Sequence, residues 1–324
     1  MEELGVNWYL SFDSDMSQVP ATAHKVPFIQ VPANAAVWNS CQAEAIGSMN
    51  EDDIKALGFS DPVKVRSTAF ANPGSYWYIF GEANRYNFMT GERFAPVFQY
   101  YYNQIKLADS SANIIGTSVL NWDWICLGCG GYQQGKVWLQ AFINAYENLS
   151  GGVKPPVDVW AIDAYPIDWV RTPNDSRHAD IVIDQFTKMR QYLNGIAEYA
   201  NTPIWVTEIA VHVGYDGWEW DPFPTNIEPV GGYNPDKMSD YMTAVLDWLD
   251  ANAVEQNIEK WFFFKTWKDI ANPELDGYMG ISFFDNPAQG ASRTCLGDIY
   301  RARSLDDPPV VCDAAGNTVP APAP

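Results

Sequence analysis

The sequence has few basic residues and few histidines. Its 20 Lys and Arg stand against 40 Asp and Glu, which gives a net charge of −20, and only 3 His are present. A surface of this charge repels phosphate backbones, anionic lipids and polyanionic glycans. A neutral substrate fits this charge balance better, and we expect no nucleic-acid partner.

Potential metal ligands are also scarce. Of the 5 Cys, only Cys126 and Cys129 form a Cys-x-x-Cys pair, and a structural zinc site usually needs a second pair of Cys or His ligands. The pair could alternatively be a redox motif, but Gly130 and Gly131 oppose the helix that would follow it. We therefore expect neither a metal nor another cofactor.

Long apolar runs are absent as well. No stretch approaches the roughly 20 apolar residues of a membrane span, and the start of the chain, LGVNWYLSF, has neither the charged nor the long apolar segment of a signal peptide. We expect no membrane partner. Five cysteines nevertheless suit an exported protein, so we expect a secreted or extracellular protein, acting as a monomer. The sequence does not fix the disulfide pairing; our working hypothesis joins Cys295 to Cys312 and Cys126 to Cys129, with Cys41 free.

By contrast, aromatic residues are abundant, with 14 Trp and 17 Tyr. Most of them are expected to fill a core. The rest suit a second use, because a planar ring offers a wide contact surface to the apolar face of a sugar at little entropic cost.

Strand-like and helix-like patterns alternate along the chain. The strand candidates have the near-continuous apolar content of parallel strands covered on both faces; they are residues 5–12, 26–32, 76–80, 113–120, 157–165, 203–211 and 260–267. Between several of them, apolar residues recur with a helical period and mark one buried face, as at Phe94, Phe98, Tyr101 and Ile105. Repeated strand–helix units predict a (β/α) barrel or a doubly wound sheet, and the lack of a Gly-rich phosphate loop after the first strand disfavours the sheet.

We therefore predict a single-domain α/β fold, a (β/α)8 TIM barrel, in residues 1–312. The length of 324 residues and the hydrophobic content of 47% suit one such domain. The missing eighth strand is expected within residues 54–73, where DPVKVRSTAF is the best candidate. Residues 313–324 end in NTVPAPAP, which we expect to be a Pro/Ala-rich tail or linker that does not pack.

Two of the strand candidates end in a glutamate. SYWYIFGEANRYN, residues 75–87, carries Glu82, and TPIWVTEIAVH, residues 202–212, carries Glu208. In a barrel both lie at the carboxyl ends of strands, where the βα loops build the active site. Two such carboxyl groups about 5 Å apart can cleave a glycosidic bond with retention, because one protonates the leaving oxygen and the other attacks the anomeric carbon.

With these two segments, the chain resembles the clan A glycoside hydrolases over most of residues 4–303. That superfamily has a (β/α)8 barrel, an acid/base Glu after the fourth strand and a nucleophile Glu after the seventh; the resemblance assigns these roles to Glu82 and Glu208. The common acid/base motif reads Gly-Asn-Glu-Pro-Asn. FGEAN matches it at Glu82 and at Asn84, a substrate-binding residue by this resemblance, but has Gly81 where the family's Asn contacts the sugar 2-hydroxyl.

Further segments extend the resemblance. DVWAIDAYPID is similar to the sixth strand, which often ends in His-x-Tyr, so Tyr165 is expected to hydrogen-bond the nucleophile and Asp163 replaces the histidine. Asp163 could bind a sugar hydroxyl, raise the proton affinity of Glu82, or pair with a Lys or Arg. FFFKTWKD resembles the eighth strand, whose Trp forms the floor of the subsite before the cleavage point, which suggests Trp267 as a sugar platform.

Two loops supply other candidates. LNWDWICLGCGGY, residues 120–132, offers Trp124 as a platform, although loop packing explains this residue equally well. His212 could line the cleft or cap a loop. The long segment 214–235 is rich in Gly, Pro and aromatic residues, as functional loops often are, and its acids do not follow a calcium-binding pattern.

These observations predict a retaining glycoside hydrolase that acts on a neutral, β-linked oligo- or polysaccharide, with endo-β-glycanase action favoured. An alternative is a carbohydrate-binding barrel that has lost catalysis, because Gly81 and Asp163 depart from the family pattern. An esterase is disfavoured, since the sequence has no G-x-S-x-G motif.

Overall fold

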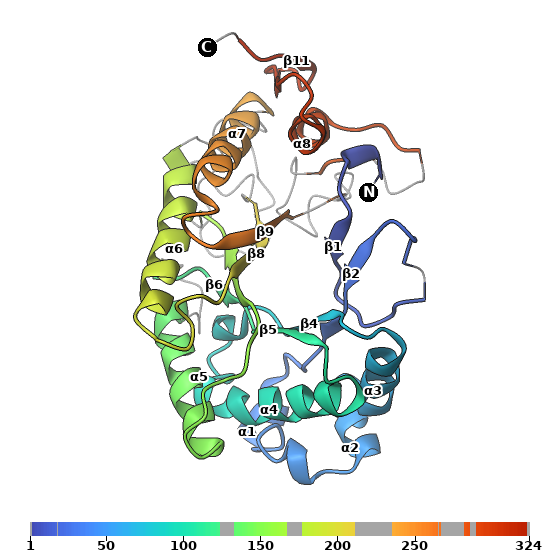
Figure 1. The fold of residues 1–324 in the computed structure, drawn as a ribbon, viewed down its shortest axis with the longest axis vertical. Coiled ribbons are helices and arrows are strands. Elements are labelled where there is room, and N and C mark those ends of the chain that lie inside the picture. The colour runs from blue at the N-terminus through green and yellow to red at the C-terminus, as the bar shows by residue number, and fades with distance from the viewer. Residues whose placement is uncertain are drawn as a thin grey trace.

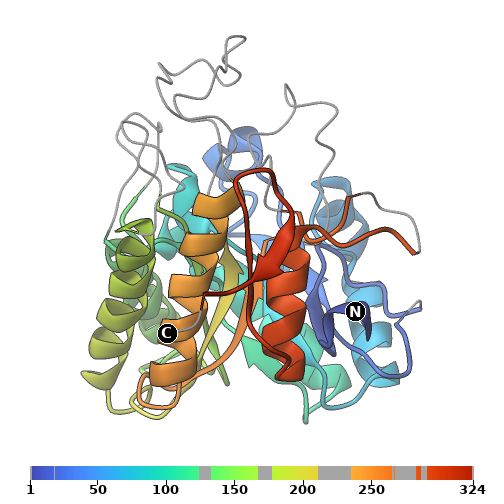
Figure 2. The same ribbon diagram turned by 90° about the horizontal axis from the view of Figure 1, so that it is seen from above.

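A central ring of strands surrounded by helices makes up the protein. The computed structural model describes residues 2–17, 19–123, 133–166, 177–210, 235–264, 266, 282–285 and 290–322. In Figure 1 the strands surround a common centre and the helices lie outside them. Figure 2, turned by 90°, shows the long helices running alongside the strands. The chain is therefore a single α/β domain.

Parallel strands form the inner layer. They are β1 (Trp8–Leu10), β2 (His24–Val26), β3 (Phe28–Ile29), β4 (Tyr76–Ile79), β5 (Asn113–Ile115), β6 (Val119–Leu120), β7 (Trp160–Ala164), β8 (Ile204–Ile209) and β9 (Ile258–Phe263). Parallel ladders join β1 to β2, β3 through β4 to β5, and β6 through β7 and β8 to β9. Only Pro27 separates β2 from β3, and only residues 116–118 separate β5 from β6. The ladders therefore follow one another around the ring.

Side chains connect the two ends of this series, β1 and β9. The Lys260 ammonium of β9 lies 4.4 Å from the ring centroid of Trp8. The ring centroids of Phe12 and Phe264, just beyond the two strands, are 6.5 Å apart. Each of the seven predicted strand regions contains all or part of a strand. The α/β barrel prediction is therefore confirmed.

Helices form the outer layer, and their apolar faces cover the strands. They are α1 (Ala35–Asn39), α2 (Glu51–Ala56), α3 (Pro62–Ala71), α4 (Gly91–Ala108), α5 (Gly135–Leu149), α6 (Arg177–Asn194), α7 (Pro235–Asn252) and α8 (Cys295–Leu305), with short 3-10 turns at Glu2–Leu4, Ile46–Ser48 and Ala83–Arg85. The periodic residues predicted on α4 are fully buried. The fully buried Trp side chains confirm that many aromatic residues belong to the core; they are Trp38, Trp77, Trp138, Trp160 and Trp205. Within the described ranges, no helix is long and apolar enough to cross a lipid bilayer.

The prediction of a strand within residues 54–73 is wrong. This region forms the end of α2 and the whole of α3. Asp61 Oδ1 accepts hydrogen bonds from the backbone N–H groups of Val63 and Lys64, at 2.9 and 3.3 Å, and Pro62 occupies the first helical turn. An Asp cap followed by Pro is a strong helix start, and it outweighs the strand preference of the two β-branched valines. No strand is described within residues 54–73.

The C-terminal segment is tied to the outer layer. β10 (Val310–Cys312) pairs antiparallel with β11 (Thr318–Pro320), so the expectation that residues 313–324 do not pack is wrong for part of this segment. A disulfide joins Cys295 of α8 to Cys312 of β10, which confirms this pairing, and Cys41 is free and exposed, as expected. Cys126 and Cys129 lie outside the described residues.

We expect the Cys295–Cys312 disulfide to contribute about 3 kcal/mol to the free energy of unfolding, because it closes a loop with a sequence separation of 17. The double variant Cys295→Ser/Cys312→Ser should therefore unfold at clearly lower denaturant concentration than the wild type. Cys41→Ser, which removes the free thiol, is the matched control and should leave the midpoint unchanged. Equal midpoints for all three proteins would show that the crosslink does not stabilise the fold.

Candidate active site

Glu82 lies on a strained turn directly after β4. Both Phe80 and Glu82 have positive φ angles, 57° and 56°, in the left-handed region that costs a residue with a side chain roughly 1–3 kcal/mol. The Glu82 N–H donates to both the carbonyl oxygen and the hydroxyl oxygen of Ser118, each at 3.1 Å. These bonds fix the turn that sets the position of the Glu82 side chain.

Glu208 comes from the end of β8, next to Asp163 of β7. In the ladder between these strands, Ile162 pairs with Val206 and Asp163 pairs with Glu208, so Thr207 is an extra residue on β8. The Tyr165 hydroxyl donates a hydrogen bond to Glu208 Oε2, which confirms the contact predicted from the sequence. A donated hydrogen bond stabilises the charged form of a carboxyl group.

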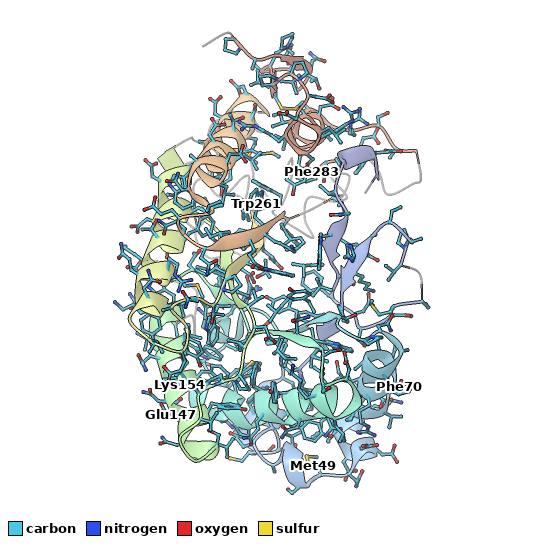
Figure 3. The ribbon with its side chains drawn as sticks, in the orientation of Figure 1. Met49, Phe70, Glu147, Lys154, Trp261 and Phe283 are labelled. Carbon is cyan, nitrogen blue, oxygen red and sulfur yellow. A yellow bond between two sulfur atoms is a disulfide. The ribbon has the colours of Figure 1, made fainter. Side chains whose placement is uncertain are left out.

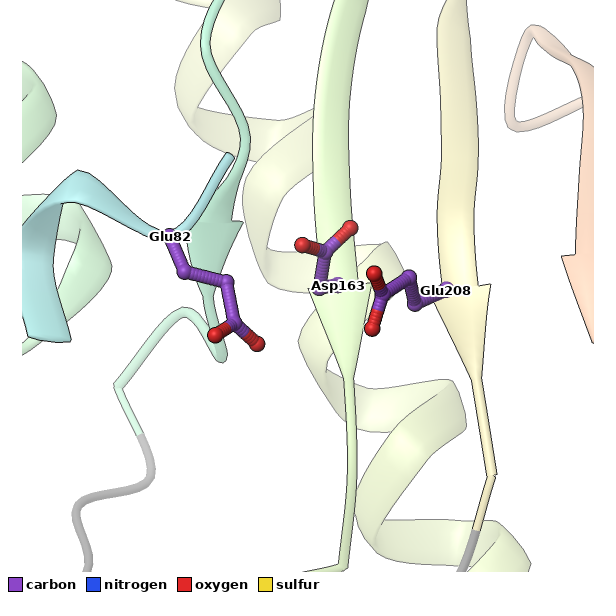
Figure 4. A group of neighbouring side chains, drawn as sticks. All are labelled: Glu82, Asp163 and Glu208. Carbon is purple, nitrogen blue, oxygen red and sulfur yellow. The ribbon is translucent and has the colours of Figure 1, made fainter. Parts of the chain in front are cut away.

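Three carboxyl groups meet at this end of the ring. Glu82, Asp163 and Glu208 each offer one oxygen, and these oxygens lie within 4.8 Å of one another. Figure 4 shows Asp163 between the two glutamates, each side chain coming from a different segment of the ring. The sequence separates these residues widely, and the fold brings them together.

Burial and mutual repulsion disfavour the charged forms of these three carboxyl groups. Burial raises the pKa of Glu82, and the Arg85 guanidinium, whose Nη1 lies 3.3 Å from Glu82 Oε2, partly offsets this shift. Burial, followed by repulsion from Asp163 and Glu82, raises the pKa of Glu208 well above its usual range, while the Tyr165 hydrogen bond acts in the opposite direction. Burial and the charge of Glu82 raise the pKa of Asp163 to about 8. Three carboxyl groups this close do not all ionise near neutral pH.

Asp163 is the most buried of the three, with 1% of its surface exposed. The Ser118 hydroxyl donates to its Oδ2 at 2.7 Å, and the Thr207 hydroxyl donates to its Oδ1 at 2.5 Å. Its oxygens thus accept hydrogen bonds from neutral hydroxyl groups instead of pairing with a Lys or Arg. Of the three roles expected from the sequence, pairing with a Lys or Arg does not match these contacts, and the neighbour whose pKa the charge of Asp163 raises is Glu208.

Replacing Asp163 with Asn should reduce the pH dependence of stability. The pKa of Asp163 is raised to about 8 in the folded protein from 3.8, so its contribution is fully present below about pH 4, falls as the pH rises, and is lost above about pH 8. Between pH 5 and 8 the wild type should therefore lose roughly 1–4 kcal/mol of unfolding free energy more than Asp163→Asn. Denaturant titrations at both pH values measure this difference. Asp180→Asn, on the exposed surface of α6, is the control, and parallel losses in all three proteins would contradict the assignment.

Asn84 is fully buried, and its side chain binds backbone groups. Its amide nitrogen donates to the carbonyl oxygens of Leu120 and Gln133, at 2.9 and 2.7 Å, and its Oδ1 accepts from the Leu120 N–H at 2.8 Å. The expected role in substrate binding does not match these contacts, because both donors of the amide are already used. Asn84 instead ties the turn after Glu82 to the end of β6.

The residues packed against position 81 explain why it is a glycine. A Cβ atom added at Gly81 would lie 2.7 Å from the Tyr78 hydroxyl and 3.2 Å from the Ser118 hydroxyl. Tyr78 also donates a hydrogen bond to Ser118 Oγ at 2.6 Å. The space into which the expected Asn would project is therefore occupied by this pair of hydroxyl groups.

Gly81→Ala should lower the free energy of unfolding by about 1–3 kcal/mol, because the added methyl group overlaps the Tyr78 hydroxyl. Gly47→Ala is the matched control, since nothing lies within 4 Å of a Cβ at that position. Removing the obstructing hydroxyl with Tyr78→Phe should make the cost of Gly81→Ala smaller, which thermal or chemical denaturation of the double-mutant cycle measures. A cost that is the same in both backgrounds would mean that another contact determines it.

An apolar cavity of about 260 Å³ adjoins Glu208 between β1 and β9. Phe12, at its edge, is 62% exposed. The walls of the cavity include Phe12, Phe28, Tyr78, Glu208, Phe262 and Phe264. Aromatic rings beside a carboxyl group suit a ligand that has both apolar faces and hydroxyl groups, as a sugar does.

The structure places some predicted site residues and adds others. Glu82, Asp163, Tyr165 and Glu208 gather in one site, whereas the predicted residues Trp124, His212 and Trp267 lie outside the described residues. The motifs in the sequence did not indicate the hydroxyl groups that hold Asp163, which belong to Ser118 and Thr207. A signal for Ser118 exists, because the polar pair Thr117–Ser118 interrupts an otherwise apolar strand candidate.

Comparisons with known proteins identify the part of the chain that carries this site. A family model described as the glycosyl hydrolase catalytic core matches residues 79–286, more than half of the chain, and this range includes all three carboxyl groups. No match to the chain was found among curated proteins.

Solved structures share the fold at low sequence identity. A family 128 (subgroup II) endo-β-1,3-glucanase from Sorangium cellulosum is 14% identical, with a TM-score of 0.55 over 93% of this chain and 92% of that one. The corresponding enzyme from Pseudomonas viridiflava is 17% identical, with a TM-score of 0.55 over 93% and 90%. A curdlan-specific exo-β-1,3-glucanase of family 128 (subgroup III) from Blastomyces gilchristii is 17% identical, with a TM-score of 0.52 over 91% and 88%. These similarities extend over nearly the whole chain and establish its fold as that of the (β/α)8 glycosidases.

Proposed function

The chain belongs to the glycosyl hydrolase catalytic core family, and on this basis we propose that it is a retaining endo-β-1,3-glucanase with Glu82 as acid/base and Glu208 as nucleophile. The spacing of the carboxyl groups carries the proposal. One carboxyl oxygen of Glu82 lies within 4.8 Å of one of Glu208, a close approach that fits the separation of about 5 Å in retaining enzymes better than the roughly 6.5–9.5 Å of inverting ones.

The two glutamates would divide the chemistry in two steps. First, the Glu208 carboxylate attacks the anomeric carbon while Glu82 gives its proton to the glycosidic oxygen, so that the C–O bond breaks and a glycosyl ester forms. Then the Glu82 carboxylate takes a proton from water, and the water oxygen displaces Glu208 from the anomeric carbon. The negative charge moves from Glu208 to Glu82 in the first step and back in the second. Only one of the two glutamates is therefore ionised at each stage in this buried site.

The assignment of the two roles rests on the neighbours of each group. The hydrogen bond from Tyr165 to Glu208 opposes the rise in pKa that burial and the neighbouring carboxyl groups cause at Glu208, and so favours the charged form that a nucleophile requires. Burial raises the pKa of Glu82, as a general acid requires. We propose that Trp124, His212 and Trp267 contact the glycan, and that Asn84 positions the turn that carries Glu82.

The substrate class rests on charge and on the proteins with similar structures. A net charge of −20 favours a neutral glycan over a polyanionic one. Structures that share the fold over most of the chain are described as endo- and exo-β-1,3-glucanases, which supports a β-1,3-glucan as the substrate. The Cys295–Cys312 disulfide supports a secreted enzyme, which we propose acts as a monomer.

A carbohydrate-binding barrel without catalysis is the alternative. The departures at Gly81 and Asp163 motivated it, but both glutamates remain within reach of one glycosidic bond. In addition, Tyr78 and Ser118 account for Gly81 by their packing. Both observations favour the enzyme.

Reducing-sugar release from separate neutral glycans tests the proposal. The panel contains a β-1,3-glucan, a β-1,4-glucan, a β-mannan, a β-xylan and a β-galactan. We expect release from the β-1,3-glucan with a mixture of oligosaccharides at early times, strongly reduced release by Glu82→Gln and Glu208→Gln, and full activity in the presence of EDTA. Activity on another glycan would contradict the substrate assignment, and tight binding without any release would support the binding barrel.

A further inference from the structure

Ser118 occupies a central position behind the catalytic carboxyl groups. It lies in the three-residue break between β5 and β6 and is fully buried. Most buried serines bind one nearby backbone group, whereas Ser118 contacts residues from β4, from the turn after β4 and from β7.

All the hydrogen-bonding capacity of the Ser118 hydroxyl is used. Its oxygen accepts from the Tyr78 hydroxyl at 2.6 Å and from the Glu82 N–H at 3.1 Å, and its hydrogen is donated to Asp163 Oδ2 at 2.7 Å. A hydroxyl group has two lone pairs and one hydrogen. Because the Glu82 N–H can only donate and the Tyr78 hydroxyl donates in this contact, the hydrogen of Ser118 points at Asp163.

This arrangement also determines where Asp163 can hold a proton. Oδ2 accepts from Ser118, so a proton on Asp163 would sit on Oδ1, which faces the Thr207 hydroxyl. The Thr207 hydroxyl oxygen can accept a hydrogen bond from this proton. The hydroxyl hydrogen of Thr207 then turns toward the Ile162 carbonyl oxygen, 3.4 Å away. Every hydrogen in this chain of groups then has an acceptor, and a neutral Asp163 requires only that the Thr207 hydroxyl hydrogen turn.

We propose that Ser118 is a positioning residue for general acid/base catalysis, which holds Glu82 in its left-handed conformation and fixes the orientation of the Asp163 carboxyl group. The inference rests on the role of Glu82 in the proposed function. Glu82 has a φ angle of 56°, and its N–H is held by the carbonyl and hydroxyl oxygens of Ser118. Loss of the hydroxyl would remove half of this anchor and take one hydrogen-bond partner from each of the Tyr78 hydroxyl and Asp163, which would keep their contacts to Thr207.

Leaving-group dependence distinguishes this role from general structural support. Ser118→Ala should lower kcat/KM on the β-1,3-glucan about 10- to 100-fold, because a displaced acid protonates the leaving sugar poorly. With a dinitrophenyl β-glycoside, whose leaving group needs no proton, the loss in the glycosylation step should stay below about threefold. Thr117→Val is the matched control, since Thr117 is an adjacent, fully buried residue whose hydroxyl makes one long contact, to the Ser118 carbonyl oxygen at 3.4 Å; it should leave both reactions unchanged.

Two further variants keep the test decisive. Ser118→Cys retains the shape of the side chain with a weaker hydrogen-bonding group, and it should show the same selective loss if Ser118→Ala does not fold. In the double variant Ser118→Ala/Glu82→Gln, the Ser118 change should add little on the glucan, because its effect passes through Glu82. Equal losses on both substrates, or losses that multiply in the double variant, would overturn the inference. If Glu82→Gln itself shows no leaving-group dependence, the acid/base assignment fails instead.

Discussion

Glu208→Ala should lose roughly 10⁴- to 10⁶-fold in kcat on the β-1,3-glucan, because the variant cannot form the glycosyl ester through which both steps pass. The loss should affect activated aryl glycosides as well, since a better leaving group does not replace a nucleophile. Glu208 accepts a hydrogen bond from Tyr165 and pairs with Asp163 in the ladder between β7 and β8. The substitution removes only the carboxyl end of the Glu208 side chain, so we expect the ring of strands to be retained. Stopped assays of sugar release, with circular dichroism to verify folding, measure this loss.

A small anion should partly restore Glu208→Ala. Truncation leaves space beside the anomeric carbon, which azide can enter to attack from the side that Glu208 would use. The product with an activated β-glycoside should be the α-glycosyl azide. Glu255→Ala, which removes an exposed glutamate, is the control and should keep full activity. If the restored activity yields the β-glycosyl azide instead, the anion attacks from the other side of the sugar, which would contradict the assignment of Glu208.

Glu82→Gln should lose about 10²- to 10⁴-fold on the glucan, because the leaving sugar then departs without a proton. With a dinitrophenyl β-glycoside the first step should remain fast and the ester should accumulate, since the general base for the second step is also missing. A burst of dinitrophenol followed by a slow steady state is the expected time course. Glu92→Gln, an exposed glutamate in the first turn of α4, should behave as the wild type.

The pH profile supplies a second test of Glu82. Burial raises its pKa in the folded enzyme, so its protonated, active form should persist above the usual titration range of a glutamate. Activity should then fall as the pH rises through this raised pKa, because Glu82 loses the proton that it must donate. Glu82→Gln should lack this alkaline decline with the activated substrate. If Glu82→Gln shows the same decline at alkaline pH, another titrating group of the site causes it.

The sequence predicted the parts of the site that depend on local pattern. Apolar strands ending in Glu82 and Glu208 indicated two carboxyl groups at one end of a barrel, and the resemblance of DVWAIDAYPID to the sixth strand of the clan A enzymes implied the bond from Tyr165 to Glu208. The contacts of Ser118 could not be predicted in the same way. They join residues 36 to 45 positions apart, and they depend on the break between β5 and β6 and on the extra residue in β8.

The errors of sequence interpretation also have local causes. The strand missing from the predicted barrel is not found within residues 54–73, because Asp61 and Pro62 start a helix there. Asn84 matched a motif position, but its amide is used by the backbone of Leu120 and Gln133. A motif match gives a residue's place in the chain, whereas burial and hydrogen bonds decide which of its groups remain available.

Trapping the glycosyl-enzyme tests the central claim most directly. A 2-deoxy-2-fluoro β-glucosyl substrate with a good leaving group forms the ester faster than it is hydrolysed, because fluorine destabilises both transition states and the leaving group accelerates only the first. Intact mass spectrometry should show one added sugar, and peptide mapping should place it on Glu208, with no label in Glu208→Gln. An unlabelled wild type that releases sugar with inverted anomeric configuration would contradict the two-glutamate retaining mechanism.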